Sequence, residues 1–153
     1  MSLTKAPSTV KCSAPNGLAR RSVLLIHRDP LLGRAIERAL KHTCEVIVVG
    51  HALGAVAVLS QGWGIDLILC EVGLPEPIER AFFQALGREF PELVDRVVFL
   101  EDAGDGSGGL QRHVASKPAP RVPMPLNVAS LRGFVRRSLE HVGVTGHPTR
   151  PHR

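Results

Sequence analysis

The fold is decided by one stretch of sequence, Asp66-Leu-Ile-Leu-Cys-Glu71-Val-Gly-Leu-Pro75. Its apolar run, residues 67–70, is typical of a strand that is buried on both faces of a parallel sheet. The run ends at a single carboxylate, Glu71, and the chain then leaves through a Gly-Leu-Pro turn. Open α/β sheets bind their ligands at the carboxyl ends of their strands, so Glu71 is a candidate functional residue.

Strand and helix signals alternate on both sides of this stretch. Asp29 is a favoured N-cap residue and Pro30 suits the first position of a helix, so a helix is expected to begin there. Further helices are predicted from apolar residues at helical spacing and from the N-cap residue Asn127. The expected helices cover residues 30–40, 53–61, 76–90, 110–115 and a last segment from 128. The expected strands cover residues 23–26, 45–49, 67–70, 97–100 and 121–122, the last flanked by Pro and therefore at an edge.

Five strand–helix units with right-handed crossovers predict an α/β fold with helices on both faces of the sheet. The expected architecture is a flavodoxin-like, doubly wound, five-stranded parallel sheet in the order 2-1-3-4-5. We expect this domain to span residues 21–142. Residues 1–20 are predicted to form a disordered basic leader, and residues 143–153 a flexible basic tail.

Composition sets limits on the function. The chain has 153 residues, of which 44% are hydrophobic, enough for one domain with a real core. The net charge of +5 belongs to the ends: residues 1–21 carry +4 and residues 143–153 carry +2, whereas the remainder carries −1. The apolar runs are too short to cross a bilayer and the N-terminus has no apolar signal core, so we expect a cytoplasmic protein without a membrane partner.

Metal and cofactor sites are not expected. The three cysteines, Cys12, Cys44 and Cys70, match no metal-ligand spacing, and Cys44 and Cys70 are predicted to be buried free thiols. The histidines form no ligand pair, and the Gly-rich stretch 104–109 lacks the P-loop lysine. We also find no nucleophile–base pair, so the sequence does not indicate an enzyme.

The region from about residue 22 to residue 141 resembles the response-regulator receiver domain of bacterial two-component systems. Five stretches carry the resemblance, in order and at plausible spacing: residues 23–30, 51–59, 66–75, 93–100 and 122–131. The resemblance implies a phospho-accepting Asp after the third strand and two acids after the first strand that help to hold Mg²⁺. It also implies a Ser or Thr after the fourth strand and a Lys after the fifth, which contact the phosphoryl oxygens.

None of these five positions keeps the residue type of the family. The acceptor position holds Glu71, the acidic pair maps to His27 and Arg28, the hydroxyl position to Glu101 and the lysine position to Met124. Asp29 falls one position too late for the acidic pair and is interpreted as the helix cap. The resemblance therefore implies a degenerate pseudo-receiver without the usual phosphorylation.

The residues at these positions lead to three expectations. Glu71 and Glu101 are expected to face each other across the strand ends, where two like charges about 5 Å apart repel by roughly 3 kcal/mol. Arg28 either pairs with Glu71, in place of the metal–carboxylate contact, or is solvated at the rim of the sheet. His27 is either a partly buried residue with a local hydrogen bond or a pH-sensitive group.

A protein partner follows from the same resemblance, because receivers commonly bind partners through the fourth helix, the fifth strand and the fifth helix. Here a basic partner face is expected, with Phe134 as an anchor or as a core residue, and its arginines are Arg121, Arg132, Arg136 and Arg137. It would suit an acidic partner, such as a histidine kinase, another receiver or output domain, or a second copy in a homodimer. Two alternatives stay open: a receiver phosphorylated at a non-standard residue, and a protein that binds nucleic acid through its basic ends. Against nucleic-acid binding, the sequence has no recognisable DNA-binding module.

Overall fold

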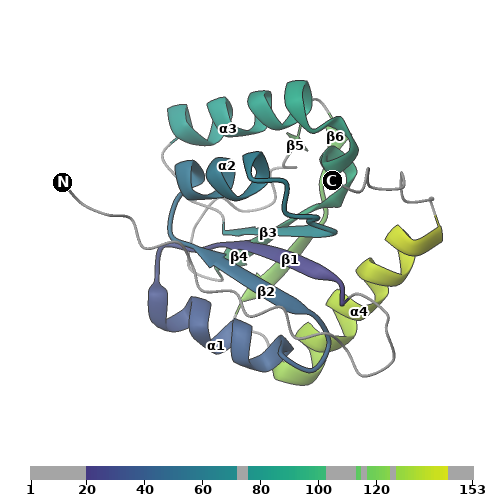
Figure 1. Ribbon diagram of the computed structural model, residues 1–153. Helices are drawn as coiled ribbons and strands as arrows, with labels where there is room; N and C mark the ends of the chain where they lie inside the picture. The colour runs from purple at the N-terminus through teal and green to yellow at the C-terminus, as the bar shows by residue number, and fades with distance from the viewer. Residues whose placement is uncertain (1–19, 72–75, 103–112, 115–116, 125–126, 145–153) are drawn as a thin grey trace.

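The central sheet has five parallel strands. The computed structural model describes residues 20–71, 76–102, 113–114, 117–124 and 127–144. The strands lie in the order β2-β1-β3-β4-β7, which is the predicted order 2-1-3-4-5 for the five strands of the sheet (Figure 1). Their bounds are Ser22–Ile26 for β1, Glu45–Val49 for β2, Leu67–Glu71 for β3, Val97–Asp102 for β4 and Arg121–Met124 for β7.

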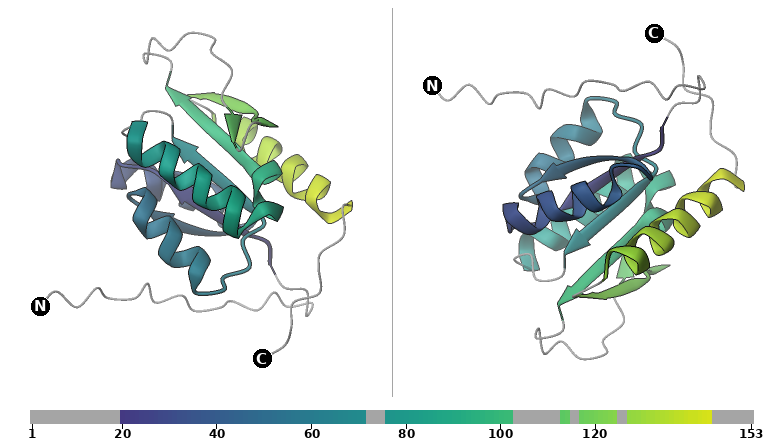
Figure 2. Two further views of the ribbon diagram at one scale, coloured as in Figure 1. Left: turned by 90° about the horizontal axis from the view of Figure 1, so that it is seen from above. Right: turned by 90° about the horizontal axis from the view of Figure 1, so that it is seen from below.

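Helices cover both faces of this sheet, as predicted (Figures 1 and 2). Helices α1 (Pro30–Leu40) and α4 (Val128–Val144) lie against one face. Helices α2 (Ala52–Ser60) and α3 (Glu76–Glu89) lie against the other, followed by the 3₁₀ helix η1 (Pro91–Arg96). Because each of the four α-helices follows a strand of this parallel sheet, each begins at the carboxyl edge of the sheet.

The core has two layers because successive strand residues point to opposite faces. Leu24, Ile68 and Phe99 pack under α2 and α3, whereas Leu25 and Leu69 pack under α1 and α4, and all five are fully buried. The continuous apolar runs of the sequence are therefore explained by burial on both faces.

The segment between β4 and β7 differs from the prediction. A helix was expected over residues 110–115, but His113–Val114 (β5) pairs in antiparallel fashion with Lys117–Pro118 (β6). Val114 is fully buried against the α2–α3 layer. A β-branched residue followed closely by prolines favours extended chain over a helix, and these signals outweigh the weak apolar spacing. The neighbouring residues 103–112 lie outside the described chain.

The structure bears on two further expectations, the end of the domain and the burial of the cysteines. Helix α4 continues to Val144, two residues beyond the predicted domain end, and the leader and tail otherwise lie outside the described residues. Cys44 and Cys70 are buried free thiols, as predicted. Burial raises the pKa of the Cys44 thiol to about 11, although the nearby charge of Arg20 opposes the shift. Among the described residues, no helix is both long and apolar enough to cross a membrane.

Helix α1 begins as the sequence predicts. The Asp29 side chain accepts hydrogen bonds from the backbone N–H groups of Leu31, at 2.9 Å, and Leu32, at 3.4 Å. Pro30 occupies the first helical position, where its missing N–H costs nothing. This cap fixes the point where the chain leaves β1, and so it fixes the backbone of residues 27 and 28.

Close packing of α1 on β2 depends on Gly33. A Cβ atom at this position would lie 2.9 Å from Cγ1 of Val48, closer than side chains tolerate. We expect Gly33→Ala to lower the free energy of unfolding by about 1 kcal/mol, although alanine normally favours a helix over glycine by a similar amount. Urea denaturation measures the change. Gly50→Ala, which lies outside the helices, is the control for adding a methyl group where a Cβ has no neighbour within 4 Å; an equal loss in both variants would contradict the packing argument.

Candidate functional site

The carboxyl ends of β1 and β3 place the candidate residues side by side. These strands are neighbours in the sheet, and Ile26 at the end of β1 is in register with Cys70. Glu71 is the last residue of β3, and His27 and Arg28 directly follow β1. The backbone N–H of His27 donates to the carbonyl of Val49 at 3.0 Å, which holds the start of this loop against the neighbouring β2.

Arg28 binds the Glu71 carboxylate through two groups. Its backbone N–H donates to Oε1 of Glu71 at 3.0 Å, and its side-chain Nε donates to the same oxygen at 2.5 Å. The Glu71 residue is only 8% exposed, whereas the side chain of Arg28 is 59% exposed. Of the two alternatives for Arg28, the structure therefore shows the ion pair, with its carboxylate buried and its guanidinium at the rim.

His27 supplies a third contact to the same carboxylate. Its Nε2 lies 3.2 Å from Oε2 of Glu71, and its Nδ1 accepts the backbone N–H of Asp29 at 3.1 Å. A nitrogen that accepts carries no proton, so this pattern assigns the imidazole proton to Nε2, which donates to Glu71. His27 is thus a buried neutral donor with a local hydrogen bond, which fits the first of its two predicted roles.

These contacts form a closed unit that we call the Glu71 cluster: His27, Arg28 and Glu71. Both carboxylate oxygens are engaged by donors from the loop after β1, and the charges of Glu71 and Arg28 balance. The cluster locks the carboxyl ends of β1 and β3 together. Sequence reasoning missed the donor role of His27, because that role depends on the register of two strands that are far apart in the sequence.

Glu101 does not face Glu71, so that expectation was wrong. In the register of β3 and β4, Glu71 stands opposite Leu100, and the next residue, Glu101, points to the other face of the sheet. There Glu101 accepts from a guanidinium nitrogen of Arg121 at 3.3 Å. Each carboxylate therefore has its own arginine on its own face, and the predicted repulsion does not arise.

Met124, the residue at the lysine position, ends β7 opposite Asp102 of β4. Its side chain lies outside the described part of the structure, so only the backbone position of this residue is placed. That backbone position is at the carboxyl edge of the sheet, beside β4.

The Glu71 cluster does not fit a magnesium ion. Mg²⁺ takes oxygen ligands in octahedral geometry, usually from one or two carboxylates with waters. Here the two positions beside Glu71 hold an imidazole and a guanidinium, and the guanidinium is a fixed cation that cannot lose its proton. Within the described ranges, no group of three His, Cys, Asp or Glu side chains is arranged to hold a metal ion.

The predicted basic partner face is divided by the structure. Arg121 lies with Glu101 on the α2–α3 side, whereas Arg132, Arg136 and Arg137 belong to α4 on the opposite side. Arg132 donates through Nε to the carbonyl of Ala39 at 2.7 Å, which ties α4 to α1. Phe134 is partly buried against the α1–α4 core, so the core role predicted for it is the one observed. Only Arg136 and Arg137 of this set are exposed.

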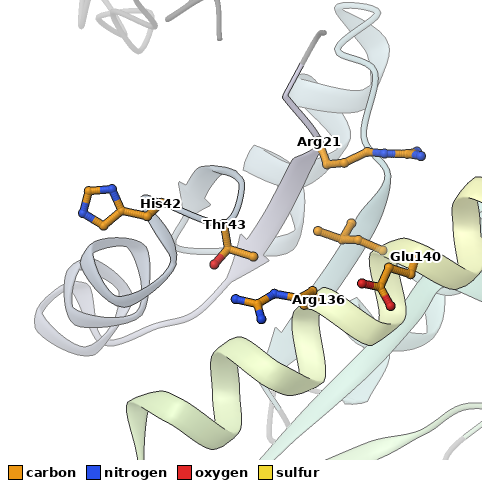
Figure 3. Close-up of a pocket in the computed structure, with 6 residues that line it drawn as sticks. Arg21, His42, Thr43, Arg136 and Glu140 are labelled. Carbon is orange, nitrogen blue, oxygen red and sulfur yellow. The ribbon is translucent and has the colours of Figure 1, made fainter. Parts of the chain in front are cut away.

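A hollow opens at the far end of the sheet, away from the Glu71 cluster (Figure 3). It has a volume of about 320 Å³ and lies between the start of β1, the turn after α1 and the C-terminal half of α4. Its lining residues are Arg21, His42, Thr43, Arg136, Leu139 and Glu140. No local sequence pattern predicts this hollow, because its residues come from three separate segments.

A buried acid, Asp66, organises the same amino-terminal edge. It accepts from the backbone N–H of Ser22 at 2.9 Å and from a guanidinium nitrogen of Arg21 at 3.4 Å. These contacts bind the start of β3 to the start of β1. Asp66 therefore has a structural role at the opposite end of the strands from the candidate site.

Comparison with known proteins reveals similarity in fold. No protein-family model matches the sequence, and no curated protein shows significant sequence similarity to it. Solved structures do match. A signal receiver domain from Vibrio parahaemolyticus has a TM-score of 0.69 at 19% identity, covering 84% of this chain and 99% of that one.

Two further structures agree. A response regulator receiver domain protein from Clostridium thermocellum has a TM-score of 0.65 at 15% identity, covering 82% of this chain and 99% of its own. A response regulator receiver protein from Sinorhizobium medicae has a TM-score of 0.59 at 18% identity, covering 80% and 97%. At such identities the likeness establishes the fold alone. The chain therefore has the flavodoxin-like fold of a response-regulator receiver domain.

Proposed function

We propose that this protein is an atypical single-domain response regulator, a pseudo-receiver that works in the cytoplasm of a bacterium in two-component signalling. It acts through protein–protein contact and is not phosphorylated. The observation that carries this proposal is the closed Glu71 cluster, in which the acceptor-position carboxylate is buried and engaged by Arg28 and His27. The receiver fold of the structural neighbours supplies the context.

Phosphoryl transfer needs groups that this site does not offer. The transferring group is stabilised by cations that contact its oxygens and by in-line positioning of the attacking oxygen. At this site Oε1 of Glu71 receives two N–H groups and Oε2 faces Nε2 of His27. Arg28 already neutralises Glu71, and within the described ranges no group of three His, Cys, Asp or Glu side chains is placed to hold a metal ion.

Contact with another protein is supported by where apolar side chains are exposed. Among the described residues, the exposed large hydrophobic side chains are Leu31 at 78%, Leu53 at 77%, Ile78 at 48% and Val128 at 47%. Each lies within the first three residues of its helix, and all four helices begin at the carboxyl edge of the sheet. Their shared placement near one edge of the sheet is the reason for proposing protein contact there. A histidine kinase or another receiver or output domain is the proposed partner class.

The test is a phosphorylation assay on the full chain. Incubation with acetyl phosphate and Mg²⁺ is followed by intact-mass spectrometry, beside an active receiver as the positive control. We expect the control to gain the mass of one phosphoryl group and this protein to gain none. A phosphoryl group mapped to Glu71, or to any other residue at the carboxyl edge, would instead establish the alternative of a receiver phosphorylated at a non-standard residue.

A further inference from the structure

We propose that the face formed by α1 and α4 binds an acidic segment of a partner protein. The inference rests on the proposed role in protein–protein contact and names the chemistry of the partner. The exposed charged residues of this face, with the adjoining turn, are mostly basic. The basic ones are Arg34, Arg38, Lys41, Arg136 and Arg137, and the acidic ones are Glu37 and Glu140.

The cations form stripes along two adjacent helices. Arg34, Arg38 and Lys41 recur at spacings of four and three residues, which places them on one side of α1. On α4, Arg136 lies one turn beyond Arg132. Because Arg132 binds the carbonyl of Ala39, that side of α4 lies directly beside α1. The two stripes therefore belong to neighbouring helices on one face of the sheet, and Figure 2 shows α1 and α4 on that face from below.

The hollow at the end of this surface gives the partner a place to insert a side chain. Arg136 extends from α4 toward the turn that carries His42 and Thr43 (Figure 3). Leu139, which is 6% exposed, supplies an apolar wall. An acidic side chain in this hollow would meet the Arg136 guanidinium and the Thr43 hydroxyl, and it would have to avoid the Glu140 carboxylate, which lines the same hollow. Planar guanidinium groups bind carboxylates in a bidentate manner, which gives direction as well as strength.

The other face of the sheet lacks this excess of positive charge. Helix α2 carries no charged residue. Helices α3 and η1 together carry more acids than bases: three arginines stand against Glu76, Glu79, Glu89, Glu92 and Asp95. The asymmetry means that the α1–α4 face, and not the domain in general, selects an acidic partner.

A protein partner fits this face better than a nucleic acid. Glu37 and Glu140 stand among the cations and would repel a phosphate backbone, whereas a protein can pair with both signs. Both helices lie flat on the sheet, so neither projects as a recognition helix into a groove (Figure 2). Aromatic residues make up only 4% of the chain, which offers little for base stacking.

The experiment compares two double variants of the full chain with the same change in net charge. R136E/R137E reverses charge on the α1–α4 face, and R80E/R88E reverses it on α3. Binding to a fluorescent poly-glutamate peptide and to a random-sequence DNA duplex is measured by anisotropy at low salt and at about 0.15 M salt. Thermal unfolding of each variant checks that it is folded.

We expect R136E/R137E to weaken poly-glutamate binding about tenfold or more, and R80E/R88E to change it less than about threefold. The inference is overturned if both variants bind like the wild type, since the basic ends of the chain would then be responsible, or if the wild type does not bind. Tighter binding of the DNA duplex that persists at about 0.15 M salt overturns it in favour of a nucleic acid. None of these results changes the outcome of the phosphorylation assay, so the two proposals fail separately.

Discussion

Replacing Arg28 with Asp should lower the free energy of unfolding by about 2 kcal/mol in the absence of divalent ions. The substitution turns an attraction at 2.5 Å into a repulsion between two carboxylates at the same strand ends. The cost is kept moderate because the Arg28 side chain is 59% exposed, so water screens much of the interaction. The backbone N–H of Arg28 still donates to Glu71, and His27 still contacts the other oxygen.

Magnesium should restore much of this loss in the Arg28→Asp variant and should not affect the wild type. Two adjacent carboxylates at the rim offer the oxygen ligands that Mg²⁺ prefers. With a dissociation constant of about 1 mM, about 10 mM Mg²⁺ stabilises the folded state by about 1.4 kcal/mol. Urea denaturation with and without MgCl₂, at constant ionic strength, measures both the loss of stability in the variant and its recovery with Mg²⁺.

Arg34→Asp is the matched control for this experiment, because it makes the same charge change on an exposed turn of α1. It should cost less than about 1 kcal/mol and should not respond to Mg²⁺. An equal response to Mg²⁺ in wild type and variant would mean that the Glu71 cluster already admits the ion. The argument from Arg28 against a magnesium site would then fail.

How far the sequence predicts this molecule depends on which interactions are local. The strands follow from apolar runs such as 67–70, whose burial on both faces leaves a continuous pattern. Their order follows from the alternation of strands and helices in a doubly wound sheet with right-handed crossovers. The helix start at Asp29 is equally local, since the cap bonds lie within three residues. The predicted helix at 110–115 fails because the apolar spacing there is weak and the segment is short, so pairing between β5 and β6 decides its structure.

The candidate site was predictable as a set of positions but not as a set of contacts. The strand ends and the resemblance place His27, Arg28 and Glu71 at one edge. Whether two carboxylates meet there depends on strand register, and a shift of one residue reverses the face. Glu101 follows Leu100, the register partner of Glu71, and therefore turns away to Arg121. Sequence patterns alone do not carry that information.

Glu71→Gln should be at least as costly as the Arg28 substitution, although it changes only one atom. The carboxylate accepts from three donors: the backbone N–H and Nε of Arg28, and Nε2 of His27. A Gln side chain has one acceptor oxygen and one donor nitrogen, so either orientation sets an NH₂ group against a donor. Moving the His27 proton to Nδ1 does not help, because Nδ1 would then face the backbone N–H of Asp29.

One buried donor is thus left unpaired in every arrangement, and the ion pair with Arg28 is lost as well. We expect Glu71→Gln to lower the free energy of unfolding by about 2–3 kcal/mol. Glu101→Gln is the control, since its side chain is 23% exposed and water can replace the contact with Arg121; it should cost less than about 1 kcal/mol. Urea denaturation of the two variants decides the matter. If the two variants lose the same free energy of unfolding, Glu71 is an ordinary carboxylate at the rim of the sheet. A larger loss for Glu71→Gln is expected only if Glu71 belongs to a closed, buried cluster.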